Sequence, residues 1–284
     1  MITGASSDAI QAFATLVRSE IEDERVDILR AALTFSRIHE PGLDVEHYVH
    51  RVDELAARVA AKIEDPDDPV QIIAALNDVL FREEVFRGNT VDYYSPRNSF
   101  LHHVLDRRLG IPITLALVYM EVARRVGFQL FGVGMPGHFL LKHYDVDGHS
   151  ILIDAFERGS IVTEDDCRQK LDSIYSCQVA LQPEFLLPVT RRQMLTRMLN
   201  NLRSIYLSQR DFRRAVQVVD LILVIYPRSP EDMKQRAVLR YNLNDFRGAL
   251  SDFEEYVKMS PDASDAEEIK QTALSLRRSM AMMN

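Results

Sequence analysis

Apolar residues recur every three or four positions over the N-terminal third of the chain, which is the spacing of an amphipathic helix. This pattern predicts helices throughout residues 8–95. Pro41-Gly42 interrupts the pattern, and Asp65-Pro66-Asp67-Asp68-Pro69 indicates a turn before a further helix at about 69–82. The first 95 residues are therefore expected to form a helical region.

Two more helices are predicted at 98–110 and 112–126. Gly110 suits a left-handed cap at the end of the first helix. Pro112 suits the first turn of the second helix, where a missing N–H is tolerated. The second helix is apolar on nearly every face, and a helix of this kind belongs in the middle of a domain.

The pattern then changes to short segments rich in β-forming residues, at 129–135, 138–144 and 150–156. Asp147-Gly148 lies between the last two segments and is a strong hairpin signal. These segments predict a small antiparallel sheet. A helix is expected to follow, because Thr163 and Asp166 have the spacing of an N-terminal capping box.

The last third of the chain contains a repeat. Asp211-Phe212-Arg213 recurs 34 residues later as Asp245-Phe246-Arg247, and Pro227 recurs at the same offset as Pro261. Each unit has the pattern helix, turn, helix, proline, and this period is that of tetratricopeptide repeats. Because each helix pair buries its apolar face only against a neighbour, we predict repeats at about 194–227 and 228–261, followed by a capping helix at 264–280.

Composition and charge narrow the class of protein. A chain of 284 residues suggests about two domains, and 46% hydrophobic with 27% charged residues is ordinary for a globular protein. Gly and Pro number only 11 each, which favours a mostly helical chain. The net charge of −8 argues against direct nucleic-acid binding, because that affinity comes largely from neutralised phosphates.

Cysteine usage and the N-terminal sequence favour a cytoplasmic location. Cys167 and Cys177 are too few for a disulfide framework, which fits a reducing compartment. Residues 1–8 lack the basic start and apolar segment of a secretory signal. The longest apolar stretch, at 110–120, is too short to span a membrane. No membrane partner is expected, and the sequence carries no signal for an oligomeric state.

Three motifs lie between Asn98 and Asp154: Asn98-Ser99-Phe100-Leu101, Gly110-Ile111-Pro112-Ile113-Thr114-Leu115 and Pro136-Gly137-His138-Phe139-Leu140. A buried helix, a strand led by His and a strand bearing Asp follow in that order, and this order resembles the transglutaminase-like core of the papain-type superfamily. The motifs and the repeats together resemble the SirB-type family, which joins such a core to C-terminal tetratricopeptide repeats. The resemblance covers residues from about 25 to 280.

The resemblance implies roles for two residues and a loss at a third. His138 matches the general base, and Asp154 matches the carboxylate that fixes the imidazole tautomer and stabilises the imidazolium. The nucleophilic cysteine of the superfamily belongs at the start of the central helix, where the helix dipole lowers a thiol pKa. The matching position is Pro112 or lies within a residue or two of it. Thr114 is the only hydroxyl nearby and a poor nucleophile, and the two cysteines come after Asp154 in the chain.

A pairing of His138 with Asp154 makes a demand on the sheet, because side chains alternate along strands. A two-residue turn at Asp147-Gly148 would place the pair on opposite faces, whereas an odd-length loop centred on Asp147 would bring them to one face. The alternatives are a strand-start His138 bonded to backbone, and an Asp154 that caps the following turn with Gly159.

Other polar residues have structural alternatives as well. Asn98 is expected either to cap the helix at 98–110 or, with Arg97, to line the cleft that the resemblance implies. Arg210 and Arg213 could bind an anion or a peptide carboxylate, or form a solvated face balanced by Asp211 and Asp220. No metal site and no cofactor are predicted, because the adjacent His102 and His103 are expected to face different ways on their helix.

The predicted fold is α+β. Residues 1–189 join the helical N-terminal region to a mostly helical transglutaminase-like core (about 96–185) with a small antiparallel sheet, and residues 190–284 form an all-α tetratricopeptide repeat domain. The predicted function is that of a non-catalytic scaffold or regulator that binds protein or peptide through the concave face of the repeats and the degenerate cleft. The alternative is a cryptic hydrolase or acyl transferase that uses His138 and Asp154 with a nucleophile other than cysteine, such as Thr114 or activated water. Enzyme activity is left open.

Overall fold

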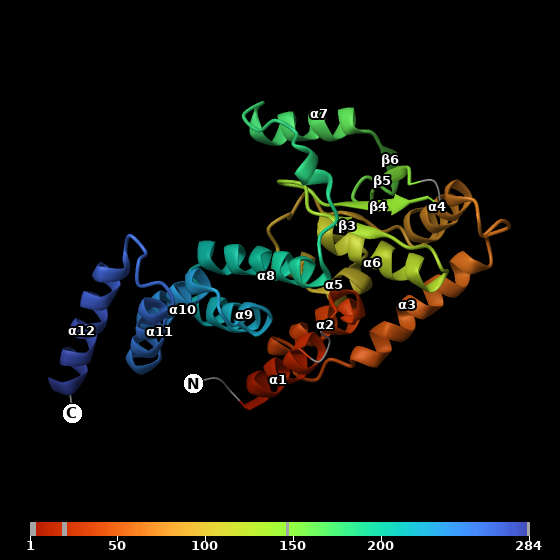
Figure 1. Ribbon diagram of the computed structural model, residues 1–284. Helices are drawn as coiled ribbons and strands as arrows, with labels where there is room; N and C mark the ends of the chain where they lie inside the picture. The colour runs from red at the N-terminus through yellow and green to blue at the C-terminus, as the bar shows by residue number, and fades with distance from the viewer. Residues whose placement is uncertain (1–3, 19–21, 146–147, 283–284) are drawn as a thin grey trace. The chain divides into compact units, whose positions relative to one another are not determined.

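The computed structural model describes residues 4–18, 22–145 and 148–282 (Figure 1). Its contacts divide the chain into two compact units, which we describe separately. The core unit comprises residues 20–198. The repeat unit comprises residues 1–19 together with residues 199–284.

The core unit is mostly helical. Its α-helices are α2 (Ile28–Phe35), α3 (Val45–Ala60), α4 (Pro69–Asn77), α5 (Leu101–Arg107), α6 (Pro112–Arg125) and α7 (Glu164–Tyr175). The side chains of Asp27, Asp44 and Asp68 cap α2, α3 and α4 by accepting backbone N–H groups of the first turn. In α6, every residue from Pro112 to Ala123 is buried, which confirms the prediction of a central apolar helix.

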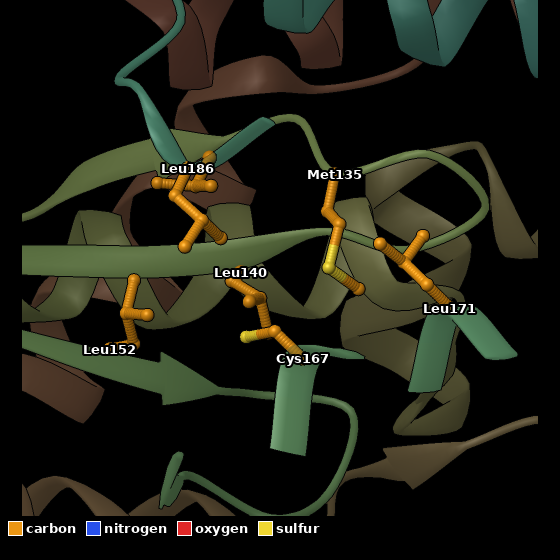
Figure 2. Packing of buried hydrophobic residues seen from close by; sticks show 7 residues of the cluster. Met135, Leu140, Leu152, Cys167, Leu171 and Leu186 are labelled. Carbon is orange, nitrogen blue, oxygen red and sulfur yellow. The ribbon is translucent and has the colours of Figure 1, made fainter. Parts of the chain in front are cut away.

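An antiparallel sheet lies against α6. It contains β3 (Phe131–Val133), β4 (Leu140–Tyr144), β5 (Ser150–Asp154) and β6 (Ser160–Val162), hydrogen-bonded in that order, and α6 contacts β3 and β4. Leu140 and Leu152 of neighbouring strands pack with Cys167 and Leu171 of α7 and with Leu186 (Figure 2). The sheet therefore adjoins α6 and has apolar contacts with α7.

Two predictions about local structure were wrong in the core unit. The helix expected at 98–110 ends at Arg107, and Arg108 rather than Gly110 adopts the left-handed conformation, with φ of 57°. Gly110 instead belongs to β2 (Leu109–Gly110), which pairs in parallel with β1 (Arg87–Gly88). A side chain at Gly110 would meet Oγ1 of Thr114 at 2.8 Å, so this position requires glycine for close packing.

The repeat unit contains the predicted helix pairs. They are α8 (Arg191–Ser208), whose residues 191–198 belong to the core unit, with α9 (Phe212–Ile225) and α10 (Pro230–Asn242) with α11 (Phe246–Met259), followed by α12 (Ala266–Met282). Asp211 and Asp245 cap α9 and α11 in the same way, by accepting the N–H groups of Arg214 and Gly248. The 34-residue offset therefore corresponds to a repeated structural unit, and the predicted α+β fold class is confirmed.

The first helix, α1 (Gly4–Arg18), belongs to the repeat unit, whereas the predicted division of the chain placed it in the domain 1–189. It packs against α9 of the repeat unit, and Nε of Arg18 donates to the carbonyl oxygen of Val224 at 3.0 Å. Its apolar residues Ala9, Phe13 and Val17 are buried. An amphipathic helix must bury its apolar face against some partner, and periodicity alone does not identify that partner.

A buried charge network connects the two repeats. Arg236 of α10 donates to Oδ1 of Asp220 on α9 at 2.6 Å and to both carboxylate oxygens of Asp252 on α11 at 2.7 Å and 2.9 Å. Arg240 donates to Asp252 at 2.9 Å. Burial raises the pKa of Asp220, although the charge of Arg236 opposes this shift. One guanidinium thus compensates carboxylates from both repeats.

Candidate functional site

His138 and Asp154 lie together in the core unit. Nε2 of His138 is 2.7 Å from Oδ2 of Asp154, and both side chains are buried. The register of the sheet explains this contact, because β4 and β5 pair Leu141 with Ile153 and Tyr144 with Ser150. In this register both residues project from one face, as the odd-length loop requires. Asp147 itself lies outside the described residues. We call His138 and Asp154 the dyad.

The carboxylate of Asp154 accepts four hydrogen bonds. Oδ1 accepts the N–H groups of Phe156 and Glu157, and Oδ2 accepts from Nε2 of His138 and from Nζ of Lys170 at 3.2 Å. Asp154 thus contacts the imidazole of His138 and also accepts the N–H groups of the following turn. Burial alone would raise its pKa, but the hydrogen bond and charge of His138 and the charge of Lys170 hold the pKa below its usual value.

Lys170 and Arg197 contact the two residues of the dyad, and neither contact was predicted from the sequence. Lys170 lies on α7, and burial would lower its pKa, but the charges of Asp154 and Glu157 raise it. Arg197 lies on α8, and its guanidinium donates to the carbonyl oxygens of Met135 and His138 at 2.9 Å and 2.6 Å. Arg197 therefore holds the turn that carries His138. The helical pattern shows neither contact, because each depends on tertiary packing.

The start of α6, where the family resemblance places the nucleophile, carries no cysteine. Pro112 occupies its first position. Oγ1 of Thr114 is 2.8 Å from the carbonyl oxygen of Asn98 and 3.1 Å from that of Ile111, and it accepts the N–H of Ile111. The hydroxyl is fully buried and acts within the backbone of this turn. These contacts account for Thr114 as a capping residue.

We expect Thr114→Val to lower the free energy of unfolding of the core unit by about 1–3 kcal/mol, because buried backbone groups at Asn98 and Ile111 lose their partner. Thr114→Ser keeps the hydroxyl and is expected to lose less than half as much. Urea unfolding followed by circular dichroism measures both variants. Equal stability of Thr114→Val and wild type would contradict this structural role.

Asn98 is buried but does not cap a helix, so that prediction was wrong. The N-cap residue of α5 is Phe100, and Asn98 lies in the 3-10 turn η4 (Pro96–Asn98) that precedes it. The amide of Asn98 donates to the carbonyl oxygens of Asp92 and Tyr93 and accepts from Asn89. Asn98 thus connects the loop before α5 to the start of α6. Arg97 is exposed.

Cys167 is a buried thiol with a raised pKa. Cys167 is buried beneath the sheet, and burial together with the charges of Asp166 and Asp154 raises its pKa to about 11. Cys167 and Asp154 both line a pocket of about 510 Å³ beside β6 and α7. Cys177 is exposed. A thiol with a raised pKa is a weak nucleophile at neutral pH.

Arg210 and Arg213 are both exposed in the repeat unit. Asp211 pairs with their neighbour Arg214 at 3.3 Å. Asp220 does not balance these arginines, as one alternative expected, because it is buried and pairs with Arg236. The side chains of Arg210 and Arg213 are therefore accessible to a ligand.

The expectation that His102 and His103 face different ways was wrong. Their ring centroids are 4.0 Å apart, and both Nε2 atoms face Glu40. α5 begins only at Leu101, so the two rings extend from its first turn toward the same loop. His143 is separate, with its ring stacked on Phe128 and Nδ1 2.9 Å from the carbonyl oxygen of Gln129.

The dyad can hold an imidazole in one tautomer. With the proton of Nε2 donated to Asp154, Nδ1 is left as a proton acceptor, and within the described part of the chain Nδ1 makes no hydrogen bond. However, the His138 side chain is only 5% exposed. General base catalysis needs a nucleophile within hydrogen-bond reach. The start of α6 holds a proline, which has no nucleophilic group, and a threonine whose hydroxyl is hydrogen-bonded to the backbone.

Family comparisons agree with this architecture. Residues 46–200 match the model of the transglutaminase-like superfamily, and residues 202–273 match a tetratricopeptide repeat model. The chain is thus a transglutaminase-like protein with tetratricopeptide repeats. It belongs to the UPF0162 family of SirB-type proteins, as its motifs predicted.

Individual relatives show how far the similarity extends. A UPF0162 protein of Xylella fastidiosa is 32% identical over 253 residues, which cover 88% of this chain and 90% of the relative. F-box only protein 21 of Mus musculus is 32% identical over 183 residues, covering 61% of this chain but only 28% of that protein. A crystal structure of menin aligns over 93% of this chain and 73% of menin, with 12% identity and a TM-score of 0.40. Among the described helices, none has the length and apolar character to cross a membrane.

Proposed function

We propose that this protein is a non-catalytic scaffold of the cytoplasm that binds protein or peptide segments. In this proposal the transglutaminase-like core retains its imidazole–carboxylate pair as a structural element, and the tetratricopeptide repeats supply the docking surface. Tetratricopeptide arrays expose extended surfaces that suit such binding.

The observation that carries the proposal is the start of α6. A nucleophile there would benefit from the unpaired N–H groups of a helix N-terminus, but the position holds Pro112 and a Thr114 hydroxyl bonded to Asn98 and Ile111. The raised pKa of Cys167 supports the same conclusion. No other thiol except the exposed Cys177 is present in the sequence.

The repeat unit offers a groove for a peptide. A pocket of about 710 Å³ between α10, α11 and α12 is lined by Tyr241, Phe246, Leu276 and Met280 together with several polar side chains. Tyr241 is 48% exposed, and its ring meets that of Phe246 edge-on at 5.5 Å. Exposed aromatic side chains in a groove are common anchors for a bound segment. We propose that Arg210 and Arg213 of the same unit contact an acidic side chain or the C-terminal carboxylate of the bound peptide.

We expect no turnover by the full-length protein on p-nitrophenyl esters or on glutamine amides offered with an amine acceptor. His138→Ala should leave that background rate unchanged, with His143→Ala as the matched histidine control. Absorbance and ammonia release measure the two reactions. Turnover by the wild type that disappears in His138→Ala but persists in His143→Ala would establish the enzyme instead.

A second prediction concerns peptide binding. Peptides are selected from a random library on the full-length protein, and their affinity is measured by fluorescence anisotropy. Tyr241→Ala is expected to weaken binding about tenfold, since anchor residues contribute more than about 1 kcal/mol. Val238→Ala, an exposed residue of α10 outside the groove, is the control. Binding that both variants retain equally would place the docking surface elsewhere.

The buried pair itself favours a second candidate function, hydrolysis by water. Nε2 of His138 lies 2.7 Å from Asp154. With the ring proton on Nε2, Nδ1 could deprotonate a water molecule without a protein nucleophile. The 5% exposure of His138 weighs against it. The turnover assay above decides between the two functions.

A further inference from the structure

Three metal-ligating side chains converge in the core unit outside the dyad. Glu40 follows the 3-10 turn η2 (Ser36–Ile38), and His102 and His103 lie in the first turn of α5. The Nε2 atoms of His102 and His103 lie 3.2 Å and 3.1 Å from Oε1 of Glu40. We propose that Glu40, His102 and His103 bind one divalent transition-metal cation of the Zn²⁺ type. This proposal is independent of the proposed scaffold function.

The state of His102 is the second observation that points to a ligand. Its side chain is only 2% exposed, and among the described residues neither ring nitrogen has a hydrogen-bond partner. The contact of Nε2 with Glu40 is close, but it lacks the alignment of a hydrogen bond. Buried polar groups are nearly always satisfied. A cation between the three side chains would accept the ring lone pair that the protein leaves unpaired.

The spacing of the donor atoms fits a small coordination shell. One ligand atom from each side chain lies within 4.8 Å of the others. Bonds of about 2.0–2.1 Å arranged tetrahedrally place neighbouring donors about 3.3 Å apart, close to the two observed separations. Three protein ligands leave a fourth position, which water would fill.

The donor set selects the class of cation. Two imidazoles and one carboxylate suit Zn²⁺ and its first-row neighbours, whereas Mg²⁺ and Ca²⁺ prefer oxygen ligands. The rings of Tyr48 and Phe100 lie 5.9 Å from the ring of His102 and shield that side of the site. Arg97 lies within electrostatic range of both histidines, so we expect weaker binding than in a cysteine-rich zinc site.

The test uses the full-length protein, treated with a chelator and then desalted. Zn²⁺ binding is measured by competition with a chromophoric chelator, and Co²⁺ is added separately as a probe whose visible spectrum reports its coordination. We expect one Zn²⁺ per chain. Glu40→Gln and His103→Gln should each weaken binding by at least about 100-fold, because loss of a ligand exceeds the 10–100-fold loss seen for its supporting contacts.

Two controls separate this site from other donors. His50→Gln alters an exposed histidine whose Nε2 lies 3.4 Å from Glu54, and Cys177→Ser removes the exposed thiol. Both should bind Zn²⁺ like the wild type. The substitutions avoid the buried His102, and circular dichroism verifies that each variant is folded. A wild type that takes up no Zn²⁺ at micromolar concentration, or ligand variants that bind as tightly as the wild type, would show that the cluster is an ordinary histidine–carboxylate ion pair.

Discussion

Arg236→Leu should destabilise the repeat unit by about 3–5 kcal/mol, the cost expected when one partner of a buried ion pair is removed. Asp220 suffers most, because its other cationic neighbour, Arg240, is 3.8 Å away. Asp252 keeps its 2.9 Å contact with Arg240. Urea unfolding measures the loss, and amide hydrogen exchange in α9 and α10 locates it in the repeat unit.

Two further variants make this prediction specific. Asp220→Leu combined with Arg236→Leu should recover part of the stability, because no unpaired carboxylate remains on α9. Lys258→Met, which removes an exposed pair with Glu255, should change stability by less than about 0.5 kcal/mol. A double variant as unstable as the single one would mean that Arg236 contributes through packing rather than charge.

The same variant should respond to acid in a defined direction. The pKa of Asp220 is raised by burial even in the wild type, and loss of Arg236 removes the cation that opposes this shift. The folded state then binds a proton at a higher pH than the unfolded state, whose pKa is about 3.9. Stability of Arg236→Leu relative to wild type should therefore increase as the pH falls from 7 toward about 4.

Asp154→Ala is the second substitution with a large expected effect, about 3–5 kcal/mol in the core unit. It removes the acceptor of four donors, which include the ammonium group of Lys170 and the imidazole of His138. Asp154→Asn keeps an oxygen for the two backbone N–H groups and should lose about half as much. Urea unfolding of the full-length protein measures all three proteins.

A matched control and a pH series test the cause. Glu157→Gln alters an exposed partner of the same Lys170 and should cost less than about 0.5 kcal/mol. The pKa of Asp154 is held below its usual value, so its stabilising effect is present above about pH 4 and is lost as the pH falls through the folded-state pKa. The difference between wild type and Asp154→Asn should shrink in that acidic range. A difference that stays constant would assign the effect to shape rather than charge.

Local patterns predicted most of the fold because they report contacts between near neighbours in sequence. The central helix followed from its apolar run, and α9 and α11 followed from a repeated Asp at their N-caps. The parallel pairing of β1 with β2 could not be predicted, because each strand is two residues long and its register depends on segments 22 residues apart. The end of α5 at Arg107 was not predicted either, because the left-handed backbone conformation of Arg108 has no sequence signal.

The candidate site divides in the same way. His138 and Asp154 were predicted through the family resemblance, and strand alternation then set the condition under which the two side chains meet. Lys170 and Arg197 come from α7 and α8, and their contacts arise only when those helices pack. The convergence of His102 and His103 was missed because adjacent helical side chains were expected to point apart, whereas both rings turn toward Glu40.

The packing of α1 on α9 has a consequence for synthesis on the ribosome. α1 leaves the ribosome well before α9, because the partner for Phe13 and Val17 ends only at Ile225. At about 5–20 residues per second, translation needs on the order of 10–40 s to cover that gap. During this interval the apolar face of α1 is uncovered in the nascent chain, so chaperones that recognise emerging segments have a defined period in which to bind it.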